Sequence, residues 1–258
     1  VMDGYGHHEV IIDHFEHGME IHGMSHEHLE MLVGTYRRRM EELYSADDRI
    51  KYVLVFKNFG SAAGASIKHT HSQLIAMPIV PENVYNEVLS SQNYYRKYHQ
   101  CVFCSLIDEA LTFEATVYNR ESGEIRRKID VGQYVVERGE RFIAIKPFAS
   151  RYEWEVHILP LQHQSNFMQI TPEDTADFAR VLKRTMQRLD RVLGGAQYNY
   201  YIHTVPRCEL SHDCDDSYHW HMEICPRTSI PTGFELGSGL FITTISPEDA
   251  AARLREAL

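Results

Sequence analysis

The residues best suited to chemistry lie in one short stretch, Lys68-His69-Thr70-His71-Ser72-Gln73. On a β-strand, residues two positions apart point to the same face, so His69, His71 and Gln73 would be neighbours. A neutral imidazole attacks phosphorus near pH 7, and a glutamine amide can donate to a phosphoryl oxygen. We therefore predict phosphoryl or nucleotidyl transfer through a covalent intermediate on His71. The alternative is a hydrogen-bonded core histidine beside a surface glutamine.

The segment just before this stretch, residues 58–66, consists largely of small residues. Small side chains let backbone N–H groups approach an anion, as they do in phosphate-binding loops. The GxxxxGK[ST] spacing of a P-loop is absent, so the alternative is a flexible surface loop. The histidines that follow favour the phosphate-binding interpretation.

A second possible site begins with Cys101 and Cys104, which are separated by two residues. Two thiolates at this spacing can share one tetrahedral zinc ion with two histidines from elsewhere in the chain. The repeat described next supplies His163 and His219 as those histidines. The alternative is a pair of buried thiols, and a redox pair is disfavoured because no thioredoxin-like strand and helix surround the cysteines.

The elements that must position these residues occur twice in the same order. Each half has a strand, a histidine, a capped amphipathic helix, a second strand and a His-x-His pair. We predict a duplicated α+β unit, with a first half over residues 1–99 and a second half over residues 100–258. The predicted elements are strands at 8–12, 52–58, 155–159 and 198–205, helices opening at Ser25 and Thr171, further helices over 81–97 and 247–258, and strand structure within 124–145.

The composition limits the class of protein. The chain has 258 residues, is 43% hydrophobic and carries a formal charge of -10, from 26 Lys and Arg against 36 Asp and Glu. An acidic chain of this kind disfavours nucleic-acid binding, and no apolar run is long enough to cross a membrane. Five cysteines in a chain this long indicate a reduced, cytoplasmic protein that keeps cysteines for metal.

The stretch from Asn58 to Gln73 resembles the active-site region of galactose-1-phosphate uridylyltransferases, which carry a His-Pro-His-Ser-Gln signature. The similarity extends over nearly the whole chain and includes His8-Glu9-Val10-Ile11-Ile12, His219-Trp220-His221 and Gly233-Phe234-Glu235. Membership of the histidine-triad superfamily would imply an α+β fold of duplicated histidine-triad-like units, with antiparallel sheets and helices packed on them. It would also imply a zinc-containing, homodimeric enzyme of galactose and carbohydrate metabolism.

The resemblance assigns roles to individual residues. His71 matches the nucleophile that accepts the nucleoside monophosphate, and Gln73 matches the glutamine that contacts the phosphate. Two further groups match substrate-binding positions: Asn58, Gly64 and Ser66 for the nucleotide, and Phe234 and Glu235 for the hexose.

The resemblance also implies metal ligands. His17 and His69 match two ligands of a first zinc site, whose Cys-x-x-Cys partner would lie before Val1, so we expect the first half to lack its N-terminal part. For a second site, some family members use four residues that match Cys101, Cys104, His163 and His219. Others use a glutamate and three histidines that match Glu87, His203, His219 and His221. His219 cannot serve both sets fully, so both alternatives stay open.

Two departures from the family pattern bear on the substrate. Thr70 replaces the signature proline, as in the branch similar to plant ADP-glucose phosphorylase. Phe234 replaces the tyrosine expected at a sugar-binding position, and the lost hydroxyl weakens the prediction of galactose as the sugar.

The predicted function is that of a UDP-glucose:hexose-1-phosphate uridylyltransferase, which acts on a nucleotide sugar and a sugar phosphate and binds neither nucleic acid nor a membrane. One alternative is an ADP-sugar phosphorylase or adenylyltransferase, and another is a hydrolase. The non-enzyme alternative is a catalytically silent, zinc-stabilised nucleotide-binding protein.

Overall fold

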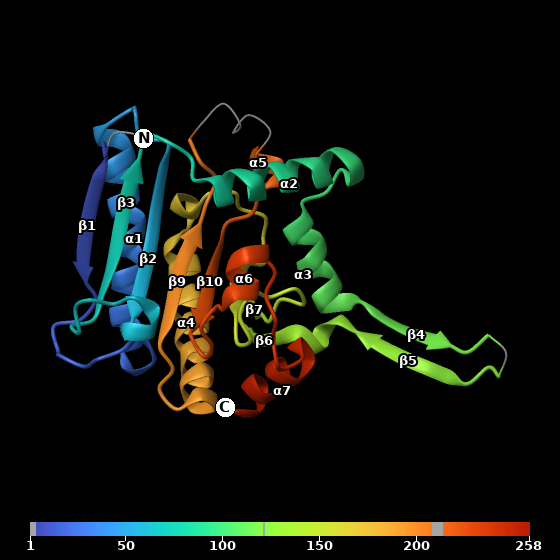
Figure 1. Cartoon of the computed structure of the whole chain (residues 1–258). Helices are drawn as coiled ribbons and strands as arrows, with labels where there is room; N and C mark the ends of the chain where they lie inside the picture. The colour runs from blue at the N-terminus through green and yellow to red at the C-terminus, as the bar shows by residue number, and fades with distance from the viewer. Residues whose placement is uncertain (1–3, 121, 208–213) are drawn as a thin grey trace.

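A computed structural model describes residues 4–120, 122–207 and 214–258 of the chain. These residues form an eight-stranded antiparallel sheet of order β1-β3-β2-β9-β10-β8-β7-β6, and a β4–β5 hairpin that projects from it (Figure 1). The strands are β1 (His7–Ile12), β2 (Tyr52–Phe59), β3 (His71–Met77), β4 (Glu114–Tyr118), β5 (Ile125–Asp130), β6 (Val135–Arg138), β7 (Phe142–Ile145), β8 (Val156–Pro160), β9 (Tyr198–His203) and β10 (His221–Pro226). The predicted α+β class with antiparallel strands is confirmed.

The helices pack on both faces of the sheet. They are α1 (His26–Ala46), α2 (Glu82–Tyr98), α3 (Val102–Thr112), α4 (Pro172–Leu193), α5 (Cys214–Ser217), α6 (Gly233–Ser238) and α7 (Pro247–Glu256). None of the helices in the described ranges is both long enough and apolar enough to cross a bilayer.

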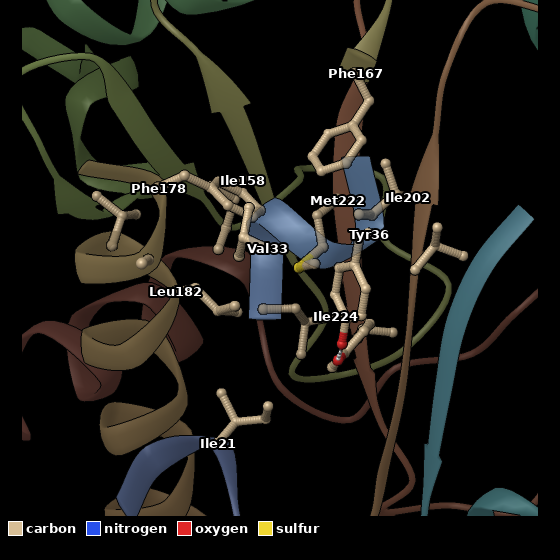
Figure 2. Close-up of a cluster of buried hydrophobic side chains, with 14 of the residues drawn as sticks. Ile21, Val33, Tyr36, Ile158, Phe167, Phe178, Leu182, Ile202, Met222 and Ile224 are labelled. Atoms are coloured by element: carbon tan, nitrogen blue, oxygen red, sulfur yellow. Dashed lines mark hydrogen bonds between the residues drawn. The ribbon is translucent and has the colours of Figure 1, made fainter. Parts of the chain in front are cut away.

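The main core lies between the sheet and the two long helices α1 and α4 (Figure 2). The predicted apolar positions of α1, from Leu29 to Leu43, are all buried. Both helices begin where the capping residues predict: the Ser25 side chain accepts from the His28 N–H group, and Thr171 forms a capping box with Asp174. Local capping therefore accounts for where these two helices begin, and the helical spacing of apolar residues accounts for the faces that they bury.

The two halves of the chain join at β2 and β9, which pair antiparallel with Asn58 opposite Asn199. The ladder continues on both sides, so one row of residues crosses five strands through the pairs Gln73–Phe56, Phe56–Tyr201, Tyr201–Glu223 and Glu223–His157. Directly opposed residues share a face. The sheet therefore gathers polar side chains of both halves on the face opposite α1 and α4.

The structure differs from the sequence prediction at two His-x-His pairs and in one hairpin. β3 begins at His71 and β10 begins at His221, so His69 and His219 lie in the irregular segments just before these strands. The two histidines of each pair therefore do not share a strand face, and each pair can serve two different sites. Strand β4 of the hairpin was not predicted, because its burial pattern is almost entirely exposed and gives no apolar alternation.

Candidate active site

A hollow of about 370 Å³ lies against the first-half sheet, and two chain segments line it, residues 57–61 and 65–71. Asn58, Ser66, Lys68 and His71 are among the lining residues, whereas Gly64 is not. Gly64 instead closes the turn of the small-residue loop with a φ of 81°, a conformation that favours glycine. The small-residue segment and His71 thus share one pocket.

His71 is held in a defined tautomer. Its side chain is buried with 6% exposed, and its Nδ1 atom lies 2.8 Å from the carbonyl oxygen of His69. A carbonyl oxygen only accepts hydrogen bonds, so Nδ1 carries the proton and donates it. The lone pair of the neutral ring is therefore on Nε2, the nitrogen that a nucleophilic attack requires.

Two amide side chains lie on the same face of the sheet as His71: Asn58 lines the pocket, whereas Gln73 is not among its lining residues. The Oε1 atom of Gln73 lies 2.8 Å from Nε2 of His8, and Oδ1 of Asn58 accepts from Nδ2 of Asn199 at 2.7 Å. In this arrangement both carbonyl oxygens are engaged outside the pocket. The N–H2 groups are then free to donate to an anion. The role of Asn199 was not predicted, since its partner across the β2–β9 junction is set by strand pairing between the two halves.

The loop of small residues is shaped by the second half as well. Oε1 of Gln197 accepts from the N–H group of Ala62 at 2.5 Å. A Cβ atom on Gly60, whose φ is 84°, would lie 2.3 Å from the Gln197 side chain. Gly60 is therefore required both by its backbone angle and by the close approach of Gln197.

Buried charges lie beneath the pocket. The Lys57 ammonium is 2.8 Å from a carboxylate oxygen of Asp13 and donates to Oγ1 of Thr70 at 2.6 Å. Glu20 lies 3.8 Å from the same ammonium. Burial raises the pKa of Glu20 to about 7, because one lysine cannot fully compensate two buried carboxylates. Thr70, which stands where the resembling signature has proline, thus accepts a hydrogen bond from the buried Lys57 ammonium immediately before His71.

The predicted Cys–His set comes together. One donor atom from each of Cys101, Cys104, His163 and His219 lies within 4.8 Å of the others. The Nδ1 atoms of His163 and His219 lie 3.2 and 3.6 Å from Sγ of Cys104. Their Nε2 atoms face the carbonyl oxygens of Asp215 and Pro160, at 2.6 and 2.9 Å. Both Nδ1 lone pairs therefore point at the sulfurs, which is the donor set that tetrahedral zinc requires.

A second cluster of possible ligands contains Glu87, His203, His221 and Glu223. The second alternative placed His219 in this set, but His219 lies against the cysteines and Glu223 takes the fourth place. Burial opposes the charge of Glu87, yet His221 and His203 hold the pKa of its carboxyl well below its ordinary value. Nε2 of His221 is buried without a hydrogen bond, although a Glu87 oxygen lies 3.1 Å away. A cation would satisfy this atom.

Glu223 was missed, although the repeat could have revealed it. It follows His221 by two residues, as Gln73 follows His71. Nδ1 of His221 also meets the carbonyl oxygen of His219, at 3.1 Å, just as His71 does in the first half. The two halves thus repeat one histidine geometry with an amide in one place and a carboxylate in the other.

The remaining predicted residues lie apart from these clusters or form incomplete ones. Nδ1 of His17 is 3.2 Å from Nδ1 of His69, and no third His, Cys, Asp or Glu in the described ranges completes a group with them. Phe234 and Glu235 belong to α6, where Glu235 caps the helix through Thr232. Neither of these two residues lines the pocket around His71.

The sequence and the fold of the chain are similar to those of known proteins. Residues 1–81 match the family model described as galactose-1-phosphate uridyl transferase, N-terminal domain. The chain is 30% identical to ADP-glucose phosphorylase of Arabidopsis thaliana over 253 residues, which cover 98% of this chain but only 65% of that protein. It is 28% identical to galactose-1-phosphate uridylyltransferase of Thermotoga maritima, over 96% of this chain and 73% of that protein.

A solved structure agrees with both matches. The crystal structure of an Arabidopsis thaliana ADP-glucose phosphorylase with bound ADP-glucose superposes with a TM-score of 0.86 at 28% identity. The alignment covers 99% of this chain and 75% of that one. The chain therefore has the fold of that protein over nearly all of its own length.

Proposed function

Because this chain is homologous to the galactose-1-phosphate uridylyltransferases and to plant ADP-glucose phosphorylase, we propose that it transfers a nucleoside monophosphate through a covalent bond to His71. The observation that carries the proposal is the hydrogen bond from Nδ1 of His71 to the carbonyl oxygen of His69, which leaves the Nε2 lone pair available in a pocket lined by small residues. The substrates would be a nucleotide sugar and a sugar phosphate.

The proposed transfer has two steps, formation and discharge of a nucleotidyl-histidine. Nε2 of His71 attacks the α-phosphorus of the nucleotide sugar, and the bond to the bridging oxygen breaks, so the sugar 1-phosphate leaves with the electron pair. The nucleotidyl-imidazole carries a positive charge, which the hydrogen bond from Nδ1 to the His69 carbonyl stabilises. In the second step an acceptor phosphate oxygen attacks the same phosphorus, and Nε2 regains its lone pair.

Gln73 and Asn58 would act on the phosphoryl group during these steps. Negative charge is carried by the non-bridging oxygens, and preorganised amide N–H2 groups stabilise it without reorientation at the moment of reaction. Their engaged carbonyl oxygens support this role. Ser66 and the backbone of the neighbouring small residues would complete the phosphate site.

The test is the intact mass of the denatured protein after separate incubations with UDP-glucose and ADP-glucose. A UMP or AMP adduct is expected, absent in His71→Ala and retained in His26→Ala, a control at the half-buried first residue of α1. An adduct that persists in His71→Ala would refute the nucleophile. No adduct with continued product release would indicate hydrolysis, and no adduct without turnover would favour a silent binding protein.

ADP-sugar phosphorylase is the second candidate, with inorganic phosphate as the acceptor. The 30% identity to ADP-glucose phosphorylase and the likeness to a structure with bound ADP-glucose favour it. An AMP adduct that inorganic phosphate discharges as ADP would select this candidate over uridylyl transfer. A UMP adduct discharged only by a hexose 1-phosphate would select the uridylyltransferase.

Zinc is the metal that we propose for Cys101, Cys104, His163 and His219. The two thiols and two Nδ1 lone pairs converge, and the backbone carbonyls fix the orientation of both rings. Four protein ligands make a closed, structural site, so zinc would tie α3 to the segments that flank β8 and β10 rather than activate a substrate. Zinc content of the purified protein, near one ion per chain, is the measurement.

We also propose that the protein is a homodimer. Six large apolar side chains lie exposed in and around α6: Ile230, Phe234, Leu236, Leu240, Phe241 and Ile242. Apolar surface of this extent is typical of a protein interface. Light scattering on the purified protein tests the dimer, and a monomer at micromolar concentration would contradict it.

A further inference from the structure

The orientation of Asn58 depends on a directed chain of hydrogen bonds from the second half. Nε of Arg227 donates to Oδ1 of Asn199 at 2.5 Å, and Nδ2 of Asn199 donates to Oδ1 of Asn58 at 2.7 Å. Nδ2 of Asn199 also donates to the carbonyl oxygen of Ala63 at 2.9 Å. These hydrogen bonds thus join the residue after β10, the start of the junction strand β9, and the pocket.

Each link in this chain has only one possible direction. A guanidinium has no acceptor atom, so the atom of Asn199 that meets Arg227 must be its oxygen. A backbone carbonyl has no proton, so the atom that meets Ala63 must be the Asn199 nitrogen. These two contacts fix the Asn199 amide independently of each other, and they agree. The atom of Asn58 that faces Asn199 must then be its oxygen.

The direction of these hydrogen bonds decides which part of the Asn58 amide can meet a ligand in the pocket. With Oδ1 engaged, the N–H2 group of Asn58 is the part of the amide left for a ligand, and no acceptor for it is recorded among the described residues. Asn199 is 9% exposed, so water does not compete freely for its amide. Arg227 is itself held in place, with its guanidinium 4.3 Å from the centre of the Tyr152 ring and its backbone N–H bonded to Gln197.

We infer that Asn199 and Arg227 are positioning residues that lock the Asn58 amide with its N–H2 group toward the pocket, where it donates to a phosphoryl oxygen. This inference rests on the proposed function for the identity of the ligand. The two residues touch no substrate. They make Asn58 present a donor to the pocket, so that a ligand with acceptor atoms, such as an anion, is favoured there over one that donates. A freely rotating asparagine would present its carbonyl oxygen to the phosphate part of the time and repel it.

The lock can be tested without any nucleotide. In protein labelled with ¹⁵N-asparagine, and assigned with Asn58→Ala and Asn199→Asp, the side-chain amide of Asn199 should exchange slowly with solvent and that of Asn58 rapidly. The reverse pattern would overturn the inference. Because this readout needs no ligand, it decides the inference even if the wild-type protein binds no nucleotide, a result that would count against the proposed function alone.

The decisive variant is Asn199→Asp, which keeps the partnership with Arg227 but replaces the donor to Asn58 with an acceptor. The Asn58 amide should then turn its N–H2 group toward Asp and present its oxygen to the phosphate. Using ADP or UDP, whichever wild type binds more tightly, we expect affinity to fall roughly ten- to hundredfold. Affinity for the matching nucleoside, adenosine or uridine, should stay within about twofold.

Three further measurements separate positioning from structural damage. Asn83→Asp adds the same charge on an exposed part of α2 and should leave nucleotide affinity unchanged. In an Asn58→Ala background, Asn199→Asp should have no further effect, because the group that it reorients is gone. If Asn199→Asp lowers affinity equally in that background, or lowers nucleoside affinity equally, the inference is wrong. Should this variant fail to fold, Arg227→Met tests the same lock, with an expected loss of about three- to tenfold.

Discussion

The Nε2 atom of His8, on the edge strand β1, lies 2.8 Å from Oε1 of Gln73 on the neighbouring strand β3. Val10 is the direct partner of Gln73 in the ladder, so His8 reaches Gln73 diagonally across the strand pair. The contact supplies a donor to the glutamine oxygen from the edge strand, outside the pocket around His71. His8 therefore does for Gln73 what Asn199 does for Asn58.

The first prediction concerns this contact. Gln73→Met should slow formation of the nucleotidyl adduct about 10²- to 10³-fold, because a preorganised donor to the phosphoryl oxygens is lost. His8→Phe puts an aromatic ring without nitrogens at this position, so Gln73 can rotate, and the rate should fall by roughly three- to tenfold. Single-turnover rates by quenched mass spectrometry measure both. An unchanged rate in His8→Phe, beside a large loss in Gln73→Met, would show that Gln73 needs no such support.

The second prediction concerns the buried pair of Lys57 and Asp13. Lys57→Met leaves the Asp13 carboxylate buried without its cation, and we expect the free energy of unfolding to fall by about 3–5 kcal/mol. The double variant Lys57→Met/Asp13→Leu removes both charges and should recover much of that loss. Urea unfolding midpoints give the comparison. A double variant less stable than Lys57→Met would mean that Asp13 stabilises the fold through other contacts.

The third prediction concerns Glu20 and pH. Its folded-state pKa of about 7 is above the ordinary value of 4.5, so its stabilising contribution is fully present below pH 4.5 and is lost as the pH rises through 7. Glu20→Gln, which cannot ionise, should be more stable than wild type at pH 8 by on the order of 1–3 kcal/mol. The two proteins should be nearly equal near pH 4.5. A stability difference that does not change with pH would contradict a raised pKa.

The fourth prediction concerns the proposed zinc site. Cys101→Ser should lower the zinc content and the melting temperature together, because the proposed ion would connect α3 to the second-half sheet. The control is Cys225→Ser. It changes a buried cysteine that is not one of the four proposed zinc ligands, so this variant should retain the metal. Elemental analysis beside thermal unfolding, before and after chelation, checks both. Equal zinc content in Cys101→Ser and wild type would place the metal elsewhere.

Much of the fold followed from local patterns in the sequence. The capping residues Ser25 and Thr171, with the apolar spacing behind them, predicted the long helices because such signals act within one helical turn. The set of Cys101, Cys104, His163 and His219 followed from the repeat combined with the two-residue cysteine spacing. These features depend on residues close in sequence, or on a repeat that the sequence displays directly.

Other features depend on strand pairing that no local pattern encodes. Asn199 opposes Asn58 only because β9 adds to β2, and Glu223 joins Glu87 only because α2 lies over the second-half strands. The prediction that both histidines of the first His-x-His pair lie on one strand was also wrong, since β3 begins two residues after His69 and leaves His69 outside the strand. Long-range pairing and strand ends therefore limited what could be predicted at the site.

The junction of β2 and β9 limits how the chain can be divided. A cut between the halves would remove a neighbour from two interior strands and expose two edges, each a template for aggregation or for exchange of halves between copies. Either half expressed alone is therefore expected to aggregate or to pair with a second copy across the exposed edge.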